Sequence, residues 1–497
     1  MDGSAPSAAA GLLLRCGSRW HFADADSPLG DELLVRAAMW PLSASLPEEL
    51  QNLFTESDEW QHRPQLDKLS AELTRGKGDA CAESSLEACL ESCALRTGRS
   101  GSAGRGLFSR AAATSGELLL RESAYAAALW PCAFTTHCHH CLCNITQGAT
   151  FRCRGRGRHY CNEQYCSSEC SDAAWSIGHS IECGTLMHAI APRTVLMCVR
   201  ALLRARAADG GAAADDLEAL LGLRDHRVDM SSPRLSQLRF HARLYARAVP
   251  AHGALEETLA KLLRLALTNS FAVSELVTAS TPDPPTFVQS HSSHSSCARV
   301  ERLGRRTVGE ALFAHAGVLN HACAPNANVR HAGRHVEIRA ASSLTASEEV
   351  CISYGPQKGF DSVHTRQERT REVYHFTCAC RTCEREAAPA AEPPRALRQR
   401  AQQLDERARA ACERGDFRAA AELSRAALDL LKRVFPEGSP QVAHEEVKLA
   451  QLLFNARADA TARAALEHAA ACMVACYGTD DGEAKEMRRL ATICAHA

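Results

Sequence analysis

Three short segments in the C-terminal half of the chain combine residue types that can do chemistry. Asn320 and His321 stand side by side, Tyr354 ends the run Glu-Glu-Val-Cys-Ile-Ser-Tyr, and a Cys-x-Cys-x2-Cys pattern occupies residues 378–383. An Asn-His pair can hold a nucleotide-like cofactor, and a tyrosine hydroxyl can act at a reacting centre. Cys323 lies inside the first segment, so its thiolate can join the three later ones in a four-ligand zinc site. The order predicts one site, in which a metal ties the first segment to the last.

A second cysteine-rich block supplies ligands for two more zinc ions. Structural zinc takes four nitrogen or sulfur ligands in a tetrahedron. The natural pairing of the eight ligands is interleaved. One ion is assigned Cys138, Cys141, Cys166 and Cys170, and the other Cys153, Cys161, His179 and Cys183. A segment this short buries little core, so metal binding is expected to supply most of its folding energy.

The composition is that of a globular protein without a strong charge bias. The 497 residues allow roughly three domains, and a net charge of -1 gives no argument for nucleic acid or an anionic membrane as the main partner. The first residues lack the features of a secretory signal, and no apolar run is long enough to span a membrane. With 24 cysteines, the chain is expected in a reducing compartment, the cytosol or the nucleus, with its clustered cysteines on metal.

The elements that must position these ligands alternate between strands and helices. Residues 98–130 indicate short strands joined by glycine-containing turns, and 193 to about 273 are helical in pattern. A polar insertion at 275–306 is followed by strands from 326 to 354, with a hairpin turning at His331-Ala-Gly333-Arg334.

The end of the chain is predicted to be almost wholly helical. It follows a Pro/Ala-rich linker at 387–394, and Phe435 and Tyr477 each begin a helix-closing sequence. A faint internal repeat of the preceding helices favours a tetratricopeptide-like arrangement, and an ordinary alanine-rich bundle is the equal alternative.

The motifs resemble those of SET-domain protein-lysine methyltransferases, and the cysteine block resembles a MYND zinc finger, as in the family that carries such a finger inside the SET domain. Within that family the chain looks most like the member-four-like branch. The resemblance implies an α+β SET fold, split by the finger and a helical insertion, with a post-SET zinc site and a helical, tetratricopeptide-like C-terminus. The implied domains are 1–97 (unknown role), 98–137 (first part of the SET domain), 138–183 (MYND finger), 184–268 (helical insertion), 269–360 (catalytic core with the 275–306 loop), 361–386 (post-SET segment) and 395–497 (helical domain).

The resemblance also assigns residues to a bound S-adenosylmethionine. The assigned cofactor residues are Gly104, Arg105, Gly106, Asn269, Asn320, His321, Tyr354 and Phe376. The glycines permit close backbone approach. Asn269 has a helix-end cap as its alternative role.

In the implied reaction, Tyr354 is the catalytic residue, and Tyr374 and Phe376 wall a narrow channel for the substrate lysine. A lysine amine has an ordinary pKa of about 10.4 and must lose its proton before it attacks the sulfonium methyl group. An apolar channel lowers that pKa by desolvation and aligns nitrogen, methyl and sulfur. The structural zinc site of Cys323, Cys378, Cys380 and Cys383 would pin the channel in place.

The chain departs from the family in several places. Seven residues separate Cys153 from Cys161 where relatives have about two, so Cys143 or His159 could replace Cys153 as a ligand. Ser123 and Ser347 stand where relatives commonly have Pro and Gly. None of these departures removes a catalytic group.

Two other functions compete with the enzyme. A scaffold with an inactive SET core would act through the MYND finger, which in the family binds short, often Pro-containing peptides. Nucleic-acid binding through the Arg-rich segment 152–158 is less favoured, because the whole chain is nearly neutral. The expected enzyme is a monomer with three zinc ions that methylates a lysine of a histone or another protein.

Overall fold

The computed structural model describes residues 93–101, 104–148, 150–155, 161–183, 188, 191–207, 212–246, 255–277, 304–386, 394–457 and 459–496. The chain divides into two compact units. The first contains Ser123–Val273 and Thr307–Gly317, and the second contains Glu87–Glu122, Ser274–Arg306 and Val318–Ala497. The predictions for residues 1–92, for His159 and for most of the polar insertion lie outside the described residues.

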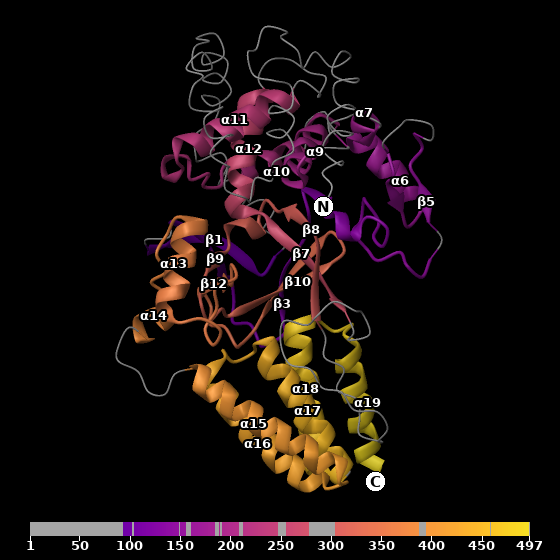
Figure 1. Ribbon diagram of the computed structural model, residues 1–497, viewed down its shortest axis with the longest axis vertical. Helices are drawn as coiled ribbons and strands as arrows, with labels where there is room; N and C mark the ends of the chain where they lie inside the picture. The colour runs from indigo at the N-terminus through magenta and orange to yellow at the C-terminus, as the bar shows by residue number, and fades with distance from the viewer. Residues whose placement is uncertain are drawn as a thin grey trace, which may run out of the picture. The chain divides into compact units, whose positions relative to one another are not determined.

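In the first unit the cysteine-rich block follows strand β4 (Ala126–Leu129) along the chain and precedes a group of helices (Figure 1). Strand β4 pairs antiparallel with β8 (Gly304–Leu312), and β7 (Phe271–Val277) completes this sheet in the order β4-β8-β7. Within the block, β5 (Phe151–Arg152) pairs with β6 (Gln164–Tyr165), followed by α6 (Ser168–Ala174), a π-helical turn (Trp175–His179) and α7 (Ser180–Glu182).

The helical insertion of the first unit contains α9 (Arg193–Ala207), α10 (Ala212–Leu221), α11 (Ser232–Ala246) and α12 (Leu255–Asn269). The apolar face expected on α9 is buried, including Val195 and Val199. Burying each such side chain stabilises the fold by roughly 1.5–3 kcal/mol. The expectation of helix as far as about residue 273 is wrong, since α12 ends at Asn269 and β7 begins at Phe271. Phe271, Val273 and Glu275 alternate with the period of a strand.

The predicted insertion is also shorter than expected. Residues 275–277 belong to β7 and residues 304–306 to β8, and these two strands are neighbours in one sheet. The polar segment therefore connects adjoining strands.

The second unit contains two further sheets. One has the order β1-β2-β12-β9, made of β1 (Leu95–Ser100), β2 (Gly104–Ser109), β12 (Glu349–Ile352) and β9 (Asn320–His321). The other has the order β10-β11-β3, made of β10 (Ala327–Ala332), β11 (His335–Ala340) and β3 (Leu118–Ser123). The predicted hairpin is confirmed, because Ala332 pairs with His335 around a turn in which Gly333 has φ of 59°.

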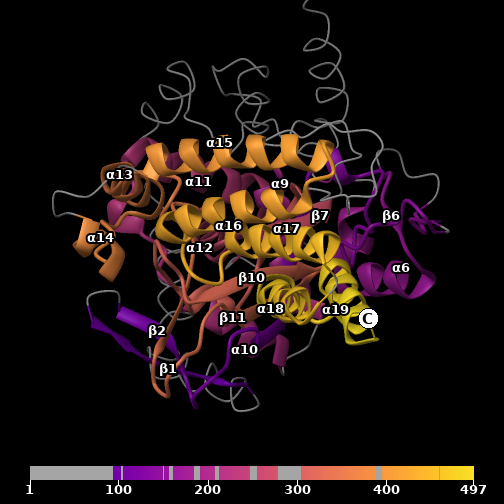
Figure 2. The same ribbon diagram turned by 90° about the horizontal axis from the view of Figure 1, so that it is seen from below.

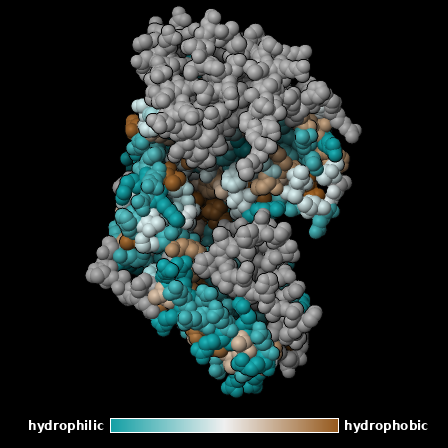
Figure 3. Space-filling view, in the orientation of Figure 1, coloured by the Kyte–Doolittle hydropathy of each residue, from teal (hydrophilic) through white to brown (hydrophobic). Residues whose placement is uncertain are grey.

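The helices of the second unit follow its strands. They are α13 (Val363–Tyr374), α14 (Arg381–Glu386), α15 (Pro394–Glu413), α16 (Phe417–Val434), α17 (Pro440–Ala456), α18 (Ala460–Tyr477) and α19 (Gly482–His496). Helices α15 to α19 pack side by side in chain order (Figure 2), and the visible outer face of α15 and α16 is largely hydrophilic (Figure 3). The predicted helix ends are confirmed, since α16 stops before Phe435 and α18 at Tyr477.

Strand β10 is connected to the C-terminal helices by hydrogen bonds from the side chain of Asn328. The amide nitrogen of Asn328 donates to the carbonyl of Gly438 (2.9 Å) before α17 and to that of Ala475 (3.2 Å) in α18. Gly438 has φ of +71°, and a Cβ atom there would lie 1.9 Å from the carbonyl oxygen of Ala341. Only glycine fits this approach without displacement of the backbone. Among the helices of the described residues, none combines the length and hydropathy of a membrane span.

Candidate active site and zinc clusters

Strand β12 places the first and last motifs of the sequence on its two sides. It pairs antiparallel with β2 through Val350 and Leu107, and parallel with β9 through Cys351 and Asn320. Gly104, Arg105 and Gly106 begin strand β2, so the segment predicted to be a cofactor loop is extended strand at this point. Residues distant in the chain thereby meet within the second unit.

The side chain of Asn320 is fixed by hydrogen bonds from its amide nitrogen. This nitrogen donates to the carbonyl of Arg105 (2.9 Å) and to Oε1 of Glu349 (2.8 Å). The other carboxylate oxygen of Glu349 accepts from the Ser100 hydroxyl at 2.6 Å. With both N–H groups engaged, Asn320 offers its carbonyl oxygen to a ligand.

Gly106 makes this arrangement sterically feasible. A Cβ atom on Gly106 would lie 2.7 Å from Oε1 of Glu349 and 2.8 Å from Nδ2 of Asn320. Glycine is therefore required so that the amide and the carboxylate can reach β2. Glu349 lies in the run that ends at Tyr354, and its role could not be read from the sequence.

The ring of His321 bridges Tyr354 and a zinc ligand. Its Nδ1 accepts from the backbone N–H of Tyr354 at 3.1 Å, and its Nε2 lies 3.5 Å from Sγ of Cys323. An accepting Nδ1 requires the neutral ring to carry its proton on Nε2, which can donate to the sulfur. Burial lowers the pKa of His321 to about 4. Both ring nitrogens are thus used within the protein.

Tyr354 is held at its hydroxyl and at its backbone. The hydroxyl donates to the carbonyl of Leu319 at 2.5 Å, and the Tyr354 carbonyl accepts from the hydroxyl of Tyr374 at 2.6 Å. Burial raises the pKa of Tyr354, so the phenol stays protonated at neutral pH. The ring of Phe376 meets that of Tyr354 edge-on, with centroids 6.4 Å apart. The aromatic residues expected at the channel therefore come together.

Asn269 belongs to the first unit, at the last position of α12. Its amide nitrogen donates to the carbonyls of Leu265 (3.1 Å) and Arg224 (3.2 Å). These bonds match the helix-end role that was the alternative to cofactor binding.

The four cysteines predicted for the third zinc site form one cluster in the second unit. They are Cys323, Cys378, Cys380 and Cys383. Sγ of Cys323 lies 3.5 Å from that of Cys383 and 3.8 Å from that of Cys378. Four Zn–S bonds of about 2.3 Å place tetrahedral sulfur atoms roughly 3.8 Å apart, so the cluster fits zinc.

A buried arginine of α13 lies beside this cluster and was missed in the sequence. Arg366 is 1% exposed and pairs with Glu386 at 2.7 Å. Its Nη2 is also 3.8 Å from Sγ of Cys383. Zinc with four thiolates carries a charge of about -2, which a neighbouring guanidinium offsets. No spacing pattern marks such a residue.

The cysteine-rich block also assembles both predicted quartets. One is Cys138, Cys141, Cys166 and Cys170, and the other is Cys153, Cys161, His179 and Cys183. In the first, Sγ of Cys166 lies 3.6 Å from Cys141 and 3.5 Å from Cys170. The first turn of α6 positions Cys170, whose backbone N–H donates to the hydroxyl of Ser167.

Cys153, rather than Cys143, joins Cys161, His179 and Cys183 in the second quartet. Its Sγ lies 3.2 Å from Nε2 of His179 and 3.4 Å from Sγ of Cys183. The β5–β6 pairing directs it there, because the backbone N–H of Cys153 donates to the carbonyl of Glu163. Cys143 is exposed and stands outside both quartets.

Comparison with known proteins shows which family has these motifs. The family model of the SET domain matches residues 104–355. The chain belongs to the SET-domain family. The matched range begins at the glycines of β2 and ends just after Tyr354, so it spans the motifs that meet around β12.

The curated relatives confirm the resemblance to the SET and MYND family of methyltransferases. Protein-lysine N-methyltransferase SMYD4 of Homo sapiens is 37% identical over 84 residues, 17% of this chain and 10% of that protein. The SMYD4 of Pongo abelii is 33% identical over 110 residues, 22% of this chain and 13% of the relative. N-lysine methyltransferase SMYD2 of Rattus norvegicus is 25% identical over 296 residues, 56% of this chain and 58% of the relative. The chain therefore matches about a tenth of the length of SMYD4 and over half of SMYD2.

Proposed function

We propose that this SET-domain protein is a protein-lysine N-methyltransferase that uses S-adenosylmethionine. The proposal rests mainly on how four residues come together. Gly106 lies in β2, Asn320 and His321 form β9, and Tyr354 follows β12, the strand between them. The names of the relatives support the same reaction. The substrate would be a lysine side chain of a histone or another protein.

Residues of the second unit would bind the cofactor and lower the pKa of the substrate amine. The carbonyl oxygen of Asn320 is suited to accept from the ammonium group of the cofactor, because the Asn320 amide nitrogen is already occupied. Phe376 beside Tyr354 provides an apolar wall, which lowers the pKa of an incoming lysine by desolvation.

S-adenosylmethionine supplies an electrophilic methyl group on a sulfonium. The lysine amine would lose its proton to solvent and then accept the methyl group, and the electron pair of the broken C–S bond would stay on sulfur. The Tyr354 hydroxyl keeps its proton in the hydrogen bond to the Leu319 carbonyl, so its oxygen would offer lone pairs to the amine and the polarised methyl group. Tyr354 therefore orients the reactants as a neutral phenol.

The three sulfur clusters are proposed to hold three structural zinc ions, two in a MYND finger and one after the SET core. The helices α15–α19 are proposed to form a tetratricopeptide-like domain, and the protein is proposed to act as a monomer in the cytosol or nucleus.

A peptide-binding scaffold is the second candidate function. A surface hollow on the cysteine-rich block is lined by Asn144, Ile145, Thr146, Gln147, Gly148 and Cys166. Such a hollow favours docking of a short peptide beside the first zinc cluster. This role is compatible with catalysis, and it would stand alone if the SET core were inactive.

Calorimetric titration of zinc-loaded protein with S-adenosylmethionine tests the enzyme proposal. Micromolar binding that disappears in the Asn320→Ala/His321→Ala double variant would support it. Asn269→Ala is the matched comparison, and loss of binding there would return Asn269 to the cofactor site. Absence of binding by folded wild-type protein would leave the scaffold as the function.

A further inference from the structure

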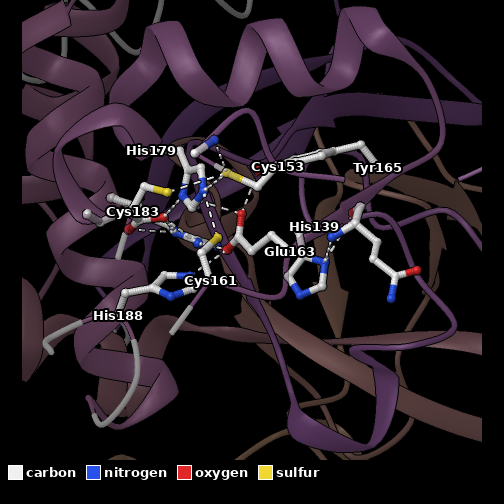
Figure 4. Close-up of polar contacts among 12 residues, drawn as sticks. His139, Cys153, Cys161, Glu163, Tyr165, His179, Cys183 and His188 are labelled. Carbon is white, nitrogen blue, oxygen red and sulfur yellow. Dashed lines mark hydrogen bonds and ion pairs between the residues drawn. The ribbon is translucent and has the colours of Figure 1, made fainter. Parts of the chain in front are cut away.

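A second layer of charged residues surrounds the zinc ligand His179 in the first unit (Figure 4). Glu163, Glu182 and His188 are buried next to it, and their ligand atoms lie close enough together to hold a metal ion. Glu163 and Glu182 are only 4% and 1% exposed. Two buried carboxylates side by side need a positive partner.

That partner is the guanidinium of Arg200 in helix α9. Its Nη2 lies 2.5 Å from Oε1 of both Glu163 and Glu182, and its Nε donates to the Glu182 carboxylate at 3.0 and 3.2 Å. Its Nη1 reaches the carbonyl of Ala127 in β4. A cation already lies between the carboxylates, so this cluster is not a fourth metal site.

The carboxylates in turn fix the ring of His179. Nδ1 of His179 lies 2.9 Å from Oε1 of Glu182 and 3.4 Å from Oε2 of Glu163. On the other side of the ring, Nε2 faces Sγ of Cys153 at 3.2 Å and Sγ of Cys161 at 3.4 Å. A proton held on Nδ1 leaves the Nε2 lone pair free for zinc, and such outer partners set both tautomer and orientation.

We infer that Arg200 is a positioning residue for the Cys153–Cys161–His179–Cys183 zinc site, acting through Glu182 and Glu163. Helix α9, which lies outside the predicted finger at 138–183, is thereby part of that site. The inference rests on zinc occupying the cluster and is independent of methyl transfer.

A close backbone contact independently joins the same two elements. Gly178 directly precedes His179, and a Cβ atom on it would lie 2.5 Å from Cβ of Leu203 in α9. The turn that presents His179 therefore packs directly on α9, one helical turn from Arg200. The finger's second zinc site depends on α9 both for packing and for charge.

The charges explain why Arg200 is needed. Zinc with three thiolates and a neutral histidine has a charge of about -1, and Glu163 and Glu182 add two more negative charges. Arg200 is the cation that contacts both carboxylates in the described residues. Without it, repulsion would disturb Glu182 and leave His179 without a fixed orientation.

The test compares Arg200→Met with Arg204→Met in the full chain. Arg204 lies one turn further along α9 and donates to the carbonyls of Ala124 and Tyr125, away from the zinc ligands. Zinc content is measured first, then the rate and affinity of zinc transfer to a colorimetric chelator. Three zinc ions per wild-type chain are expected, and a wild-type chain without zinc at the site that contains His179 would overturn the inference.

In Arg200→Met, one of the three zinc ions is expected to bind about 10–100-fold more weakly, the usual effect of losing an outer partner. Arg204→Met should keep all three at wild-type affinity, and Arg200→Lys should recover part of the loss. Cobalt substitution identifies the affected ion, since its absorption bands should change for the site that contains His179 and not for the two sites built from cysteines alone.

A variant that keeps the arginine covers the case in which Arg200→Met does not fold. Glu182→Gln removes the charge on the acceptor of the His179 proton while preserving its size, and the same single ion should be weakened. Wild-type affinity at all three sites in a folded Arg200→Met, or in Glu182→Gln, would overturn the inference. Equal weakening of all three ions would do so too, because it would show general destabilisation.

Discussion

The backbone N–H of Tyr354 donates to Nδ1 of His321 over 3.1 Å. The opposite nitrogen of the same ring lies 3.5 Å from Sγ of Cys323, a ligand of the third zinc cluster. The proposed catalytic tyrosine, the proposed cofactor residues and the third cysteine cluster are therefore linked by one imidazole. Loss of a zinc ion from this cluster is therefore expected to alter the position of Tyr354 through His321.

Cys380→Ser tests this link. We expect the variant to bind two zinc ions instead of three and to bind S-adenosylmethionine at least about tenfold more weakly, because loss of the metal would release Cys323, the sulfur partner of His321. Zinc analysis and calorimetry on the same sample measure both. Cys132→Ser is the control, since Cys132 is exposed and outside the clusters. Unchanged cofactor affinity with one zinc lost would separate the metal from the cofactor site.

Tyr354→Phe should reduce methyl transfer by about 10²–10³-fold, as expected when an oriented polar group at a reacting centre is removed. Cofactor affinity and zinc content should remain near wild type, because the backbone bonds of Tyr354 to His321 and Tyr374 persist. Single-turnover kinetics with saturating cofactor give the rate. A parallel loss of folding, seen by circular dichroism, would indicate a structural tyrosine.

Gly438→Ala should destabilise the protein more than Gly415→Ala. Both glycines have positive φ, +71° and +77°, so both substitutions carry a backbone strain of about 1–2 kcal/mol. Only at Gly438 does the new Cβ atom meet backbone, 1.9 Å from the carbonyl oxygen of Ala341. Overpacking adds about 1–3 kcal/mol. Denaturant unfolding of the two variants measures the difference, and equal midpoints would contradict the close contact.

Ser347→Gly should stabilise the protein. Ser347 has φ of 64°, in the region that glycine adopts at little cost. Relief of about 1–2 kcal/mol of strain, less the entropy of a more flexible unfolded chain, leaves a gain of roughly 0.5–1 kcal/mol. Ala346→Gly, at a residue without positive φ, should instead lower the melting temperature. A lower melting temperature for Ser347→Gly would contradict the strain.

Lys448 should stabilise the C-terminal helices below about pH 10 and lose this effect at higher pH. Burial alone would lower its pKa, but the carboxylates of Glu445 and Asp405 outweigh burial and raise it. A lysine whose folded pKa exceeds the unfolded value of about 10.4 contributes fully below that value and progressively less above it.

Denaturant unfolding of wild type and Lys448→Met between pH 8 and 11.5 measures this contribution. The Nζ atom of Lys448 lies 2.5 Å from Asp405 and the side chain is 15% exposed, so a difference of roughly 1–3 kcal/mol is expected at pH 8. The difference should shrink as the pH approaches 11.5. A difference that stays constant with pH would assign the effect to packing of the lysine chain.

Local spacing made much of the site predictable. The two interleaved quartets need only ligands that lie within one short segment, and the structure brings together the residues assigned to each. The hairpin at Gly333 and the helix ends at Phe435 and Tyr477 have short-range causes, namely turn residues and caps. The contact between the Asn-His pair and Tyr354, made by His321, could be expected from the motif order alone.

The residues that support the ligands could not be predicted in the same way. Glu349, Arg200 and Arg366 each act through partners distant in the sequence, and a single charged residue is most often a solvated surface group. The strand character of Gly104–Ser109 also depends on a partner, since it comes from pairing with β1 and β12. Such roles follow from tertiary context.

The central position of β12 has a consequence for synthesis of the chain. Val350 in β12 pairs with Leu107 in β2. Because β12 lies far later in the sequence, strand β2 leaves the ribosome long before β12 has been synthesised. The zinc ligands between 138 and 183 are complete much earlier and can bind metal while translation continues. Until residue 352 emerges, one edge of β2 stays open, and an open apolar edge invites pairing with other chains. Truncated products that stop before Glu349 are therefore expected to aggregate, even when their finger is folded and loaded with zinc.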